Sequence, residues 1–90
     1  MFSRNLAVAV IAAADSTVAR HTHPGIETGY VLEGESELAV DGKPAQQLKP
    51  GDTYQIPAGV PRMARTGAEP TKIIATFMVD KEKPLASSAP

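Results

Sequence analysis

The chain has no cysteine and no tryptophan, and its only aromatic residues are two tyrosines and two phenylalanines. Without cysteine there can be no disulfide, no thiolate metal ligand and no cysteine nucleophile, although this does not decide the cellular compartment. There are only two histidines. Any site that depends on imidazole groups must therefore be built from that pair.

The sequence also lacks an excess of charge of one sign, any segment with the helical periodicity of apolar residues, and a long apolar segment. Nine basic and ten acidic residues give a net charge of -1 without a basic stripe, which argues against a nucleic-acid partner. A charge near zero gives little self-repulsion, so self-association stays open. The apolar run over 6–14 is too short to span a membrane.

Short β-prone runs alternate with turn residues along the whole chain. Asp41-Gly42 lies between two such runs and predicts a two-residue hairpin of type I′, which needs positive φ at both central positions. Many short strands separated by turns are typical of an all-β sandwich or a small barrel. Strands are expected near 5–13, 17–23, 27–33, 36–41, 44–48, 52–56, 61–66 and 71–79.

The 90 residues predict one domain over 1–80, followed by a tail over 81–90. The tail is rich in proline, serine and alanine, so we expect it to be flexible. Residues 1–14 have an alternative interpretation as a short signal peptide, because a basic start is followed by an apolar run and small residues. We prefer a first strand there, since a barrel needs one before the histidines, and we expect a cytoplasmic protein.

Two of the expected strands, 5–13 and 71–79, are apolar on both faces. In 71–79, Ile73, Ala75, Phe77 and Val79 share one face, while Ile74 and Met78 lie on the other. A small barrel has one interior, so the second apolar face needs another cover. We predict a homodimer whose interface includes Ile74 and Met78; the alternative is that a second sheet of the same chain covers them.

The two histidines are only two positions apart, and Glu27 follows them after a Pro24-Gly25 turn. His21 and His23 project from the same side of a strand, and the next strand can bring Glu27 back beside them. Two imidazoles and a carboxylate form the facial triad that binds Fe, and that Mn, Ni, Cu or Zn can also use. Such a site keeps coordination positions open for a substrate.

The spacing of these residues resembles the cupin superfamily. His-x-His-x₃-Glu over 21–27, with Gly34 seven residues later, is similar to the first cupin motif. Gly51-x₅-Pro57-x-Gly59-x₂-Arg62 is similar to the second, in which the position of Arg62 is normally a histidine. The resemblance covers roughly 5–80 and implies a double-stranded β-helix, the jelly-roll barrel of cupins, with a metal held inside.

Carried over residue by residue, the resemblance implies that His21, His23 and Glu27 are metal ligands. Arg62 departs from the pattern, because a guanidinium stays protonated and has no lone pair for a metal. One interpretation is a three-ligand site, with Arg62 turned away or holding an anionic substrate. The other is a metal-free pocket in which Arg62 takes the place of the metal and pairs with Glu27.

Tyr54 and Gln55 precede the second motif, and only one of them can face inward. Strand parity alone does not decide between them, and Gln55 is kept with Arg62 as a candidate substrate-binding residue.

Three functions remain open, and no catalytic residue is assigned. The first is a mononuclear metalloenzyme of the dioxygenase or isomerase type. The second is a metal-free module that binds a small carboxylate. The third is a barrel whose site has decayed.

Overall fold

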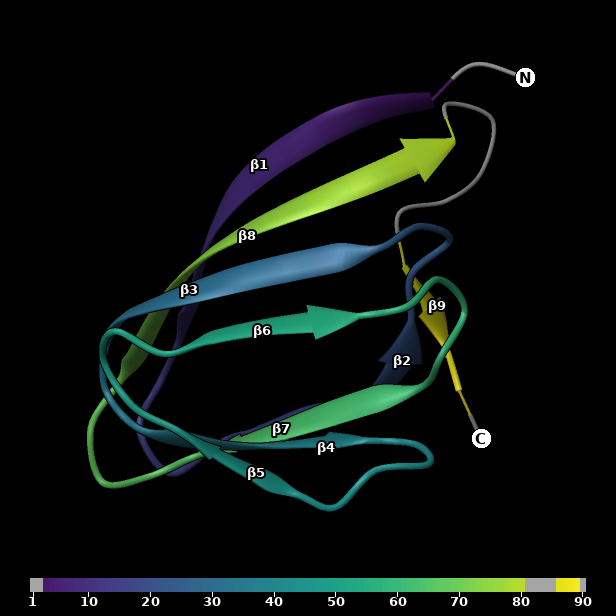
Figure 1. Cartoon of the computed structure of the whole chain (residues 1–90). Helices are drawn as coiled ribbons and strands as arrows, with labels where there is room; N and C mark the ends of the chain where they lie inside the picture. The colour runs from purple at the N-terminus through teal and green to yellow at the C-terminus, as the bar shows by residue number, and fades with distance from the viewer. Residues whose placement is uncertain (1–2, 81–85, 90) are drawn as a thin grey trace.

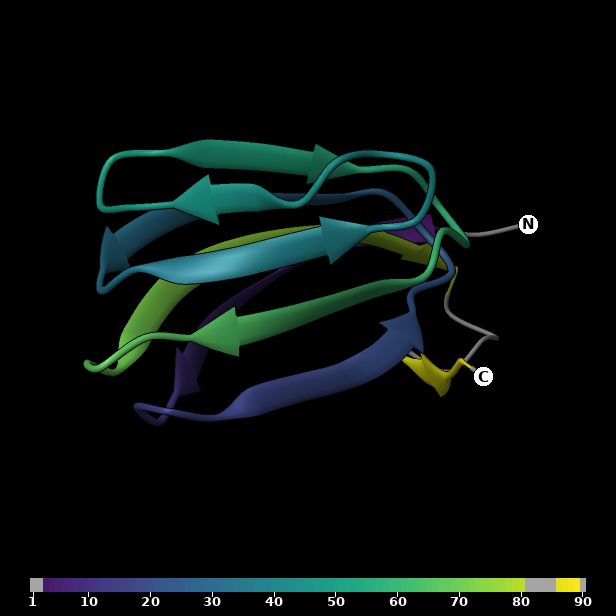
Figure 2. The same ribbon diagram turned by 90° about the horizontal axis from the view of Figure 1, so that it is seen from below.

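A computed structural model of the chain describes residues 3–80 and 86–89, and within them every regular element is a strand. The strands form two antiparallel sheets that face each other (Figures 1 and 2). One sheet has the order β1-β8-β3-β6 and the other β5-β4-β7-β2-β9. The strands are β1 (Ser3–Ala12), β2 (Thr17–Thr22), β3 (Glu27–Glu33), β4 (Ser36–Val40), β5 (Gln46–Leu48), β6 (Thr53–Ile56), β7 (Arg62–Thr66), β8 (Thr71–Asp80) and β9 (Ser87–Ser88).

The all-β barrel expected from the sequence is confirmed, and each of the expected strands is present. β9 is an addition to that set. It lies inside the expected tail and pairs with β2 through His21 and Thr22. Residues 81–85 and 90 of that tail lie outside the described part of the chain. No helix among the described residues has the length and hydropathy needed to cross a membrane.

The turn between β4 and β5 differs from its prediction. The Lys43 N–H donates to the Val40 carbonyl at 3.1 Å, and Gly42 has a φ of 84°, but Asp41 does not have a positive φ. The type I′ assignment was therefore wrong. Pro44, which has no N–H to extend the ladder, lies in the loop, and pairing resumes only at Gln46.

The apolar inner faces of the two sheets meet in the core. Val31, Leu38, Leu48 and Ile56 form one buried cluster, and Ala75 and Phe77 form a second with Val8 and Val10 against them. Along β8 the faces alternate as the sequence predicted, with Ile74 39% and Met78 51% exposed on the outside. Val79 was also expected on the inner face, but its side chain is not among those that the structure describes.

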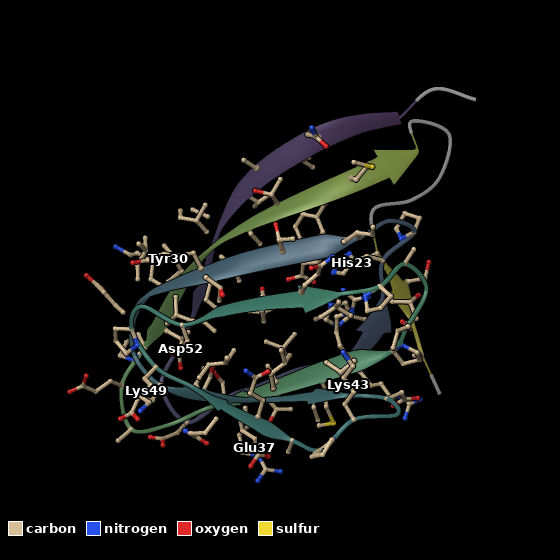
Figure 3. All side chains as sticks on the ribbon, in the orientation of Figure 1. His23, Tyr30, Glu37, Lys43, Lys49 and Asp52 are labelled. Atoms are coloured by element: carbon tan, nitrogen blue, oxygen red, sulfur yellow. The ribbon has the colours of Figure 1, made fainter. Side chains whose placement is uncertain are left out.

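The chain reversals at one end of the barrel determine where a site can form. β2 ends, and β3 and β7 begin, at this end. The loop after β6 is joined to the turn before β3 by a hydrogen bond from the Gly59 N–H to the His23 carbonyl, 2.9 Å long. His23 lies at this end, whereas Tyr30 lies toward the opposite end of β3 (Figure 3). Both cupin-like motifs therefore meet at the same place.

Candidate functional site

Five polar side chains from separate parts of the sequence converge at this end of the barrel. They come from β2 and its following turn, from the start of β3, from β6 and from the start of β7. His21 and Arg62 are direct cross-strand partners, and Tyr54 lies on the strand beside that of Glu27. The five are His21, His23, Glu27, Tyr54 and Arg62.

Arg62 points into the barrel and is only 3% exposed. Its Nη1 donates to Glu27 Oε1 at 2.7 Å, in a pair whose two side chains are both buried. Its Nε and Nη2 donate to the Val60 carbonyl at 3.2 and 2.8 Å, and Nη2 also reaches the Pro57 carbonyl at 3.5 Å. The loop before β7 thus fixes the guanidinium in place, and its charge is compensated by Glu27.

The two histidines form an edge-to-face pair, with ring centroids 4.8 Å apart and planes at 88°. His21 Nδ1 is 2.8 Å from the Ala19 carbonyl, which can only accept, so Nδ1 carries the proton. His21 Nε2 then offers a lone pair to His23 Nε2, 3.1 Å away, when His21 is neutral. His23 Nε2 also lies 3.7 Å from Glu27 Oε1, and its ring packs on Phe77.

Tyr54 completes the cluster, because its hydroxyl donates to Glu27 Oε2. A close approach by Gly29 makes this possible: a Cβ on Gly29, which is opposite Tyr54 in β3, would lie 2.1 Å from the tyrosine ring. Burial, and then the negative charge of Glu27 and the hydrogen bond to it, raise the pKa of the Tyr54 hydroxyl well above its usual value. Tyr54 therefore keeps its proton and donates a hydrogen bond to Glu27.

The raised pKa of Tyr54 predicts a loss of stability at high pH. Above about pH 10 an unfolded tyrosine releases its proton while Tyr54 retains it, so the free energy of unfolding falls as the pH rises. Urea unfolding between pH 8 and pH 11 should show a smaller fall for Tyr54→Phe than for the native chain, with Tyr30→Phe as the matched control. Equal falls in the native chain and Tyr54→Phe would contradict the buried, Glu27-bonded hydroxyl.

The five side chains form the polar end of a cavity of about 290 Å³ between the sheets. Away from these side chains the cavity wall is mainly aliphatic and includes Val10, Leu38, Leu48 and Ile73. A molecule bound there would have its polar group beside Arg62 and an apolar body along these walls.

Gln55, proposed from the sequence as a substrate-binding residue, does not lie in this cavity. It is exposed on the outer face of the sheet, opposite Thr28, and the neighbouring Tyr54 takes the inward position. This corrects the placement of Gln55, because alternate strand residues face opposite sides and the register of β6 on β3 sets which is inside. The other four proposed residues do converge: His21, His23, Glu27 and Arg62.

The donors do not fit a divalent cation in the arrangement that the structure shows. Both oxygens of Glu27 already accept hydrogen bonds, one from Arg62 and one from Tyr54. A cation bound by His21, His23 and Glu27 would be close to the guanidinium, and two positive centres a few ångströms apart repel by several kcal/mol. Among the described residues, no three histidine or acidic side chains are arranged to hold a metal ion.

Comparisons with known proteins agree on the family. The model of the Cupin domain family matches residues 7–77. Dimethylsulfoniopropionate lyase DddQ of Ruegeria pomeroyi is 36% identical over 62 residues, which are 69% of this chain and 31% of that protein. The chain therefore spans about a third of this curated relative.

Solved structures show the same architecture. The crystal structure of the lyase DddQ from Ruegeria pomeroyi has a TM-score of 0.87 at 29% identity, over 94% of this chain and 43% of that one. An RmlC-like cupin from Shewanella frigidimarina has a TM-score of 0.76 at 28% identity, over 87% of this chain and 68% of that one.

Proposed function

The chain belongs to the cupin domain family, and on this premise we propose that it binds a small, mainly apolar carboxylate inside its barrel without needing a metal ion. One observation carries the proposal: the buried ion pair of Arg62 with Glu27. Arg62 stands at the position of the usual fourth metal ligand, and its charge compensates the carboxylate that would otherwise hold the metal.

Two groups are available for an incoming carboxylate. A guanidinium has five N–H groups, and the four hydrogen bonds that Arg62 makes within the described residues leave one N–H on Nη1. The second group is the pair of His21 and His23, whose imidazole rings line the same end of the cavity as hydrogen-bonding groups.

The named relative supports this ligand class. Its substrate is, by name, a propionate, and therefore carries a carboxylate group. The likeness covers only 31% of that longer protein, so it supports a carboxylate ligand and not the lyase reaction.

Titration calorimetry in the presence of EDTA tests the proposal, with octanoate and dimethylsulfoniopropionate as probes. We expect saturable binding of at least one probe. Binding should be about tenfold weaker in His21→Ala, because a hydrogen bond from the imidazole to the charged carboxylate of the probe is lost. Arg65→Ala, a change to an exposed arginine on the same strand, is the matched control and should bind as the native chain does. Binding that disappears with EDTA would contradict a metal-free site.

A metal centre on His21, His23 and Glu27 is the second candidate, and the histidine pair favours it. Two nitrogens bound to one metal at about 2.1 Å each lie about 3 Å apart, close to the 3.1 Å found here. His21 is also held through Nδ1 by a carbonyl, as metal-bound histidines are. Fe, Mn, Ni, Cu or Zn would suit these donors, for a dioxygenase or isomerase type of reaction, once Glu27 leaves Arg62.

The outer face of the β1-β8-β3-β6 sheet supports a homodimer. No strand among the described residues covers this face, so the chain's own second sheet does not shield it. Its exposed apolar side chains are Ile11, Tyr30, Leu32, Ile74 and Met78. In sedimentation at micromolar concentration the native chain should be a dimer. The double variant Ile74→Glu, Met78→Glu should be a monomer. Gln47→Glu, on the other sheet, is the control; a native monomer would refute the dimer.

A further inference from the structure

The cavity has a second polar end, opposite the one that contains Arg62. Three hydroxyl side chains line it there, and each is at least nine-tenths buried: Ser36, Thr66 and Thr71. Ser36 and Thr66 are direct partners at the start of β4 and the end of β7, and Thr71 begins β8. The cavity therefore runs from a charged cluster, along aliphatic walls, to a group of hydroxyls.

Two of these hydroxyls are used by the fold. Thr66 Oγ1 donates to the Ala13 carbonyl at 2.7 Å and accepts from the Ser16 N–H at 2.8 Å, which holds the turn before β2 against β7. Thr71 Oγ1 donates to the Glu35 carbonyl at 3.3 Å. Both threonine hydroxyls stabilise loops at this end of the barrel. Their burial is therefore explained by the fold and does not indicate a ligand.

The hydroxyl of Ser36 is different. Ser36 is only 4% exposed, yet its hydroxyl makes no hydrogen bond within 3–80 and 86–89. It is not sealed in the core either, because no fully buried side-chain oxygen or nitrogen of the described residues lacks a partner. Its oxygen must therefore reach open space, and the open space that Ser36 lines is the cavity.

The two polar ends are a fixed distance apart. Arg62, Ala64 and Thr66 follow each other along one face of β7, and all three line the cavity. Four residues of extended strand span about 13 Å, which sets the separation between Arg62 and the Ser36–Thr66 pair along the barrel. A carboxylate with an apolar chain of about six to eight carbons would bridge the side chains at the two ends.

We propose that the natural ligand is bifunctional, with a carboxylate at the Arg62 end and a hydroxyl or carbonyl group at its far end that hydrogen-bonds to Ser36. This inference rests on the proposed carboxylate function and adds a second recognition point to it. Burying a hydroxyl in an aliphatic cavity is costly unless it finds a partner. Ser36 therefore determines whether the cavity prefers a ligand with a polar far end.

The test is the ratio of two affinities, measured by calorimetry for octanoate and for ω-hydroxyoctanoate. In the native chain, ω-hydroxyoctanoate should bind about fivefold more tightly, which is the effect of one hydrogen bond. In Ser36→Ala the order should reverse, because the ligand hydroxyl is buried without a partner. Ser87→Ala, which removes an exposed hydroxyl on β9, should keep the native ratio.

The outcomes separate the two proposals. If octanoate binds and the hydroxylated probe has no advantage, or keeps its advantage in Ser36→Ala, the Ser36 subsite is refuted while the carboxylate function stands. If neither probe binds the native chain, the Ser36 subsite is refuted, and the carboxylate function stands only if dimethylsulfoniopropionate binds. Circular dichroism of each variant checks that the barrel is folded before the ratios are compared.

Discussion

Substitution of Arg62 by methionine is expected to lower the free energy of unfolding by about 3–5 kcal/mol, measured by urea denaturation at neutral pH. Methionine has a similar length and fills the space of the arginine stem. It leaves the Glu27 carboxylate, only 7% exposed, without its cation in the interior. The loss comes from this uncompensated charge more than from a cavity.

Two variants identify the cause. Glu27→Gln in the Arg62→Met background removes the isolated charge and should recover most of the lost stability, because a buried pair can be replaced as a unit. Arg65→Met, on the exposed face of the same strand, should change stability by no more than about 0.5 kcal/mol. A loss for Arg62→Met as small as that of Arg65→Met would contradict the buried ion pair.

Substitution of Arg62 by histidine is expected to create a metal site. The change removes the positive charge and frees Glu27 Oε1 from the hydrogen bond that now occupies it. It also supplies a third imidazole directly opposite His21, the cross-strand partner of position 62. Zinc at a hundredfold excess over its dissociation constant should stabilise this variant by about 2.7 kcal/mol, an effect that EDTA reverses.

Thermal unfolding with zinc and with EDTA measures this gain. The native chain should give the same midpoint in both solutions, because Arg62 and Glu27 remain paired. Arg62→His combined with His21→Ala should lose the gain and so serves as the matched control. If Arg62→His gives no metal-dependent shift, then Arg62 is not what prevents metal binding in this barrel.

The strands could be predicted because turn residues mark their ends so clearly. Proline and glycine interrupt β-prone runs throughout the chain, and these interruptions determine strand length in a small barrel. The turn at Asp41-Gly42 was wrong in type because positive φ is unfavourable for a residue with a Cβ, and in this turn only Gly42 adopts it. β9 has no such signal, since its two residues, Ser87 and Ser88, pair only because β2 has a free edge.

The site could be predicted where a fixed spacing decides the geometry. His21 and His23 share a strand face, and Arg62 lies in a ligand position of the cupin-like frame. The side of the sheet that Tyr54 faces depends on the register of β6 on β3, which no local pattern encodes. The signal that was available is Gly29, because a glycine inside a strand often indicates a close approach by another group, here the ring of Tyr54.

Ser36 could not have been identified from the sequence. Serine is an ordinary residue beside a turn, and the turn at Gly34 precedes it. Its interior position depends on β4 being placed with Ser36 inward against Thr66, which is a property of the assembled barrel. The far end of the cavity is thus visible only in three dimensions.

The most direct test of the central claim, that Arg62 occupies the place of the metal, is the metal content of the purified native chain. Elemental analysis would follow equilibration with Fe, Mn, Ni, Cu and Zn and removal of free ions, with Arg62→His measured in parallel. We expect little metal in the native chain and nearly stoichiometric metal in the variant. Nearly stoichiometric metal in the native chain would contradict it and would make His21, His23 and Glu27 a working metal centre.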